Sequence, residues 1–166
     1  MSNETVGAAC QALLRVAGKE SEKPSARLAA LQGLADAAAY CVATVPLAEL
    51  AGKGPADIRR AAVLALPIDE SQVGSQVAHN ALVAASKDAD SKVAAAAGAR
   101  LCHTHTTAAN ATPLRQLALG ADLLAEDVVD MLPCLAASKD PADRKAIDQL
   151  AASGSPAVKA AIKNLK

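Results

Sequence analysis

The residue types best suited to bind a metal ion gather at 102–105, where the sequence reads Cys-His-Thr-His. Thiolates and imidazoles are zinc ligands, but a protein site needs three or four of them in fixed geometry. The segment therefore gives weak metal candidates, Cys102, His103 and His105, which would need folding to bring Cys134 or His79 close. The favoured interpretation places the two histidines near a helix C-terminus, where an imidazole can donate to free carbonyls. No metal and no cofactor is predicted.

Acidic residues precede several predicted helices, at Asp88, Asp90, Asp140 and Asp143. A carboxylate in this position accepts hydrogen bonds from the unpaired amides of the first turn. We therefore interpret these acids as structural caps, with a catalytic carboxylate pair as the alternative. The sequence contains no His-Glu-x-x-His motif, no Gly-rich phosphate loop and no pattern of a Ser-His-Asp or Cys-His nucleophile. An enzyme is therefore disfavoured.

Basic residues recur singly or in pairs on the predicted helices. The residues predicted to bind a partner are Arg59, Arg60, Lys92, Arg100, His103 and His105. Positive charges repeated along a surface also bind the phosphates of a nucleic-acid backbone. A protein that binds nucleic acid in this way is the alternative. Nucleic-acid binding is disfavoured because the formal net charge is zero. In addition, Tyr40 is the one aromatic residue of the chain, so a row of aromatic side chains that could stack on bases is absent.

One pattern recurs in the helices that must carry these residues. Within the segment 88–101, a cap at Asp90 or Ser91 is followed by Val93, Ala97 and Leu101, which share one helix face. Similar patterns occur at 23–31, 55–66 and 155–165. The apolar position of this pattern recurs after 35 residues, from Ile58 to Val93. It recurs again 65 residues later, at Val158, which is about two periods of 32 or 33 residues. Such a period is typical of stacked helical hairpins.

These segments resemble the second helix of HEAT-type repeats, in which a capped turn carrying Asp or Pro leads into an apolar residue, a basic residue and an alanine. The resemblance implies a short right-handed α-solenoid of about five antiparallel helix pairs, in a single HEAT-like domain over residues 1–166 that can be part of a longer protein. It implies little about activity, because one fold carries many functions. Bacterial chromophore-lyase relatives carry similar repeats, so a metal-dependent or lyase-like enzyme using the region 102–105 is an alternative, although no conjugation motif is present.

Composition also favours an all-α fold. Hydrophobic residues make up 52% of the chain, yet Phe and Trp are absent, so the interior must be filled by Ala, Leu, Val and Ile. Small side chains allow close helix contacts, and no sustained alternation of apolar and polar residues predicts a sheet. The cysteines, spaced by 31, 61 and 32 residues, follow the repeat. We interpret them as small buried thiols at equivalent places, with disulfides as the less favoured alternative.

Caps and helix breakers predict where the helices begin and end. One helix should run from Pro24 to about residue 43, and another from Gln72 to about residue 86. Asp122 should cap a later helix, in which Pro133 produces a kink rather than an end.

The chain has no uncharged apolar run of about 18 residues and no basic start followed by an apolar segment. It is therefore predicted to be cytoplasmic, without membrane insertion. The function that we predict is a non-catalytic scaffold that binds another protein through its repeat surface.

Overall fold

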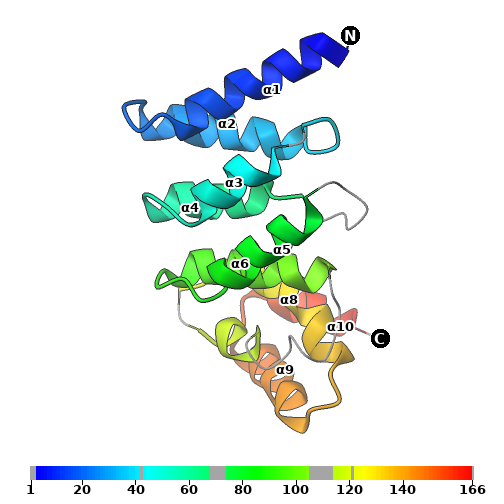
Figure 1. The fold of residues 1–166 in the computed structure, drawn as a ribbon. Helices are drawn as coiled ribbons and strands as arrows, with labels where there is room; N and C mark the ends of the chain where they lie inside the picture. The colour runs from blue at the N-terminus through cyan, green and yellow to red at the C-terminus, as the bar shows by residue number, and fades with distance from the viewer. Residues whose placement is uncertain (1–2, 42, 68–73, 105–113, 121, 166) are drawn as a thin grey trace. The chain divides into compact units, whose positions relative to one another are not determined.

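Every regular element in the described residues is a helix, so the prediction of an all-α fold is confirmed (Figure 1). The computed structural model describes residues 3–41, 43–67, 74–104, 114–120 and 122–165. The chain divides into two compact units, Met1–Ala85 and Ser86–Lys166. The single domain expected over residues 1–166 stays a prediction. None of the helices in the described ranges combines the length and apolar character that crossing a membrane requires.

The helices of the first unit form two rows. They are α1 (Asn3–Gly18), α2 (Pro24–Asp36), α3 (Thr44–Ala51), α4 (Ala56–Ala65) and α5 (Ser75–Ala85). α1 runs antiparallel to α2 and packs against it, and α3 packs against α4 (Figure 1). Contacts also join α1 to α3 and α3 to α5 along one row, and α2 to α4 along the other. Each pair therefore packs against its neighbour within this unit.

Local chemistry sets the turns of the first unit. Pro24 lies in the first turn of α2, where a missing backbone N–H costs no hydrogen bond. Gly54 has a φ of 90°, in the left-handed region that side chains disfavour, and its turn leads into α4. The most deeply buried side chains of this unit include Leu31, Leu34, Ile58, Val63 and Leu66.

Arg27 is a buried cation that joins α2 to α1. It is 6% exposed, and its Nε donates to the carbonyl of Ala17 at 2.8 Å. The last carbonyls of a helix have no partner within the helix. Arg27 therefore satisfies a group at the end of α1 and fixes the spacing of the first pair.

The second unit is also built from helices. They are α6 (Ser91–Thr104), a short helix at 114–118, α8 (Ala125–Ala137), α9 (Pro141–Ser153) and α10 (Pro156–Lys163). α8 contacts α6, α9 and α10, and α9 contacts α10. Two predicted caps are confirmed: Asp90 accepts from the amides of Lys92 and Val93, and Asp140 from that of Ala142. Ser155, which was not predicted as a cap, accepts from the amide of Val158 at the start of α10.

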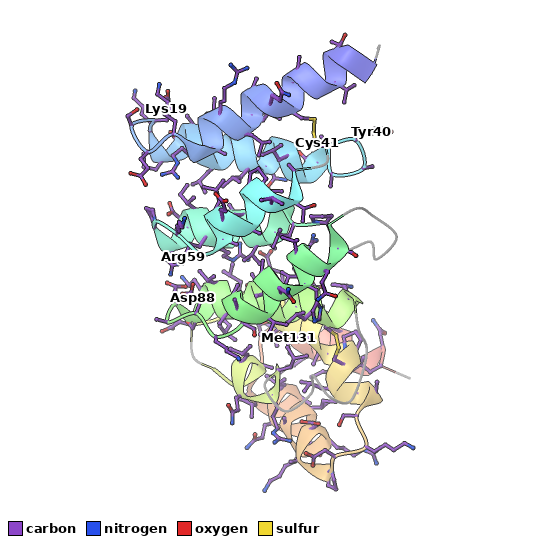
Figure 2. All side chains as sticks on the ribbon, viewed as in Figure 1. Lys19, Tyr40, Cys41, Arg59, Asp88 and Met131 are labelled. Atoms are coloured by element: carbon purple, nitrogen blue, oxygen red, sulfur yellow. A yellow bond between two sulfur atoms is a disulfide. The ribbon has the colours of Figure 1, made fainter. Side chains whose placement is uncertain are left out.

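The core of the second unit is tightly packed around Gly98. A Cβ built there would lie 2.7 Å from Leu114, 3.1 Å from Leu117 and 3.4 Å from the sulfur of Met131. Glycine is therefore required for α6 to approach α8 and the helix at 114–118. Met131, labelled in Figure 2, is fully buried in this cluster.

Several predicted helix boundaries are wrong. α2 ends at Asp36 instead of near residue 43. Ala37 is its C-cap residue, with an amide that donates to the carbonyls of Gly33 and Ala35, and residues 37–40 form turns. α8 begins at Ala125, and Asp122 is no cap but a left-handed residue with a φ of 61°. The start predicted at Gln72 lies outside the described residues, and α5 begins at Ser75. Pro133 lies inside α8 without ending it, as predicted.

The interpretation of the cysteines as free thiols is wrong. Cys10 pairs with Cys41 and Cys102 with Cys134, each with a Cα–Cα distance of 5.7 Å, and no cysteine is free. The first bond joins α1 to the segment after α2, beside the label of Cys41 in Figure 2. The second joins α6 to α8. The two pairs therefore do not occupy equivalent places, and each unit contains one disulfide.

Candidate functional site

Two of the predicted contact residues, Arg59 and Arg60, lie on α4 in the first unit, and both are half-buried. Nη1 of Arg59, labelled in Figure 2, donates to the carbonyl of Gly54 at 2.6 Å. The guanidinium therefore stabilises the turn before α4 while part of its surface stays accessible to a partner.

The other basic candidates, Lys92 and Arg100, lie on α6 in the second unit. Lys92 is exposed at the start of the helix, whereas Arg100 is half-buried near its end. Burial lowers the pKa of Arg100, and the negative charge of Asp130 opposes this effect. Lys92 is thus an accessible positive charge, and Arg100 is partly enclosed by the fold.

His103 and Asp130 face each other across α6 and α8. His103 Nε2 lies 3.7 Å from Asp130 Oδ2, and both side chains are about half exposed, at 48% and 50%. Asp130 is therefore shared by His103 and Arg100. His105 lies outside the described residues.

The described residues contain no group of three His, Cys, Asp or Glu side chains able to hold a metal ion. The sulfur of Cys102 is bonded to Cys134, so it is not the thiolate that a metal would need.

Sequence reasoning missed an ion-pair network in the second unit. Arg115 Nη1 donates to Asp143 Oδ1 at 2.8 Å and to Asp140 Oδ2 at 3.0 Å. Asp143 is 0% exposed, and its Oδ2 has no hydrogen-bond partner among the residues that the structure describes. Arg115 precedes these acids by 25 and 28 residues, so no local spacing marked them as neighbours.

The network shifts the pKa values of Asp140 and Arg115 in opposite directions. The amide of Ala142 and then Arg115 lower the pKa of Asp140 by donating hydrogen bonds to its carboxylate. The pKa of Arg115 is raised, chiefly by its hydrogen bond to Asp140. Asp140 is thus an N-cap, as predicted, whereas Asp143 is a buried partner of Arg115.

A groove of about 600 Å³ lies between α8, α9 and α10 and was not predicted. We call it the C-terminal groove. Its apolar lining comprises Pro133, Leu135, Ala136, Ala137, Ile147, Ile162 and Leu165. Arg144 also lines it and belongs in addition to a neighbouring hollow of about 540 Å³. We call Lys139, Arg144 and Lys145 the basic rim, because all three line this second hollow.

No family model matches the chain, and comparisons with curated proteins and with solved structures find no match. The resemblance to HEAT-type repeats therefore stays a prediction from sequence pattern.

Proposed function

We propose that the protein is a non-catalytic scaffold of HEAT-like helix pairs, stacked as a short right-handed α-solenoid, which binds another protein through its surface. The observation that carries this proposal is the two-row packing of the first unit, where α1, α3 and α5 follow one another and α2 packs against α4. This arrangement is what a stack of helical hairpins produces.

The positions of the helices along the chain support the same proposal in the second unit. The helices α2, α4, α6, α8 and α10 begin at residues 24, 56, 91, 125 and 156, so consecutive starts are 32, 35, 34 and 31 residues apart. Each would be the second helix of one pair. Because repeats expose residues at similar offsets, a stack of them offers an extended surface rather than a closed pocket.

Recognition would then depend on accessible charges on these helices. Lys92 is exposed on α6, and Arg59 is half-buried at the start of α4. Such charges steer an acidic partner and select its orientation more than they add to affinity. The Nε atoms of Arg60 and Arg100 are buried, which makes these two residues less suited to this role.

The cellular location is a separate part of the proposal. A cytoplasmic location, expected from the sequence, stays a prediction. The two disulfides fit an oxidising compartment better, because glutathione and thioredoxin keep most cytosolic thiols reduced.

Capture experiments with charge-reversed variants test this function. The full oxidised chain is cross-linked to proteins of its native host, alongside Arg59→Glu, Lys92→Glu and the control Lys23→Glu, an exposed position before α2. We expect a partner that the unmodified chain and the control recover equally, with about a tenfold loss for at least one of the other two. Circular dichroism checks that all variants are folded. Recovery of no protein by the unmodified chain, or equal recovery by all variants, would contradict the proposal.

A further inference from the structure

We propose that the C-terminal groove binds one amphipathic helix of a partner protein, with apolar side chains in the groove and an acidic residue against the basic rim. This inference rests on the proposed function and specifies where the partner binds and which chemistry it presents.

The groove has the lining that such a helix needs. Leu135 is 1% exposed and forms part of the floor, while Ile147, Ile162 and Leu165 are half-buried at the walls. Its volume of about 600 Å³ is within the range of sites that enclose several apolar groups. Apolar side chains at i, i+3 or i+4 and i+7 of one helix face would enter the groove together and leave water.

The charges beside the groove define the second feature of the partner. Lys139, Arg144 and Lys145 are exposed, and no hydrogen bond or ion pair of their side chains occurs among the described residues. The carboxylates nearby are Asp140, which Arg115 already binds, and Asp148. Arg144 lines both hollows, so an acidic residue on the flank of a bound helix would meet it at the groove edge.

Other ways of binding a peptide fit this groove less well. Strand addition needs a sheet edge, and the described part of the second unit has no strand. Polyproline recognition needs aromatic side chains, and the lining of this groove contains none. A nucleic-acid backbone would use the basic rim but would leave the apolar walls uncovered. A helix with an acidic flank uses both surfaces.

The test uses the full oxidised chain and two fluorescent probe peptides of about 16 residues. Both carry leucines at i, i+4 and i+7, and the residues that flank them are Glu in one probe and Lys in the other. We expect saturable one-to-one binding of the acidic probe, at least about tenfold tighter than that of the basic probe and weakened by salt. Equal binding of the two probes, or no saturable binding of the acidic one, would overturn the inference.

Matched variants locate the binding on the groove. Ala136 is exposed on α8 and lines the groove, so Ala136→Gln fills it with neutral bulk without disturbing the core. Ala160→Gln, an exposed position on α10 outside the lining, is its control. We expect about a tenfold loss of acidic-probe binding only for the first. Arg144→Glu should reverse the preference between the probes, whereas Lys163→Glu should not. Wild-type binding by Ala136→Gln would place the site elsewhere and overturn the inference.

Three further outcomes separate this inference from its rivals. A captured partner that Arg59→Glu or Lys92→Glu releases and Ala136→Gln retains would refute the groove while leaving the proposed function intact. A single-stranded oligonucleotide that displaces the acidic probe, and binds Ala136→Gln equally well, would assign the basic rim to nucleic acid. A dimer that sedimentation detects and Ala136→Gln dissociates would make a second copy of the chain the occupant. Each of the last two results would overturn the inference.

Discussion

At the scale of single residues, Arg115 and Asp143 form an ion pair in the second unit. Asp143 is fully buried, and Arg115 donates to one of its oxygens at 2.8 Å. Replacing Arg115 by Met would leave this carboxylate buried without a countercharge, which is strongly unfavourable. We expect Arg115→Met to lower the urea midpoint well below that of Arg144→Met, whose guanidinium is exposed. Adding Asp143→Leu should restore much of the loss, and a double variant less stable than Arg115→Met would contradict this account.

Asp140 gives the pH dependence at the same scale. Its pKa is lowered in the folded chain by hydrogen bonds from Ala142 and Arg115. A lowered pKa in the folded state contributes stability above the ordinary value of 3.8, and this stability is lost as the pH falls through the folded value. Asp140→Asn keeps a residue able to cap α9 but removes the charge. We therefore expect this variant to lose less stability than the unmodified chain between pH 5 and 2, measured by thermal unfolding, while Asp122→Asn behaves as the unmodified chain does.

At the scale of helices, Gly98 sets how closely α6 approaches its neighbours. An added Cβ would lie 2.7 Å from Leu114, so Gly98→Ala should overpack the core and cost about 1–3 kcal/mol, despite the better helix propensity of alanine. Gly7, in α1, has no atom within 4 Å of such a Cβ. Gly7→Ala should therefore stabilise the chain by up to about 1 kcal/mol. Denaturant unfolding of both variants measures the contrast, and a stabilising Gly98→Ala would show that α6 can shift.

The sequence predicted helices well where a local cap determines them. Asp90 and Asp140 each cap a helix as expected, because capping involves residues two or three apart. Distant pairings were not predictable in the same way. Joining Cys10 to Cys41 requires α2 to end early at Asp36, and no local breaker marks that end. The groove was missed because it arises from three helices whose packing angles no single segment encodes.

At the scale of the whole molecule, the disulfides determine how the chain responds to reduction. The bond from Cys102 to Cys134 closes a loop of 32 residues, and a cross-link of that length stabilises a protein by about 2–4 kcal/mol. We expect the Cys102→Ala/Cys134→Ala variant to lose about this much, measured by urea unfolding without reductant. In the unmodified chain, denatured without reductant, a thiol reagent should label no cysteine. Labelling of all four would contradict the pairing.

The placement of one disulfide in each unit has a consequence for biosynthesis. Four cysteines allow three pairings, so an unfolded chain that oxidises all at once can scramble. During translation, Cys10 and Cys41 are synthesised well before Cys102. The first unit can therefore fold while the second is still being synthesised. Vectorial synthesis thus presents Cys10 and Cys41 to each other before Cys102 and Cys134 have emerged, which favours one bond within each unit.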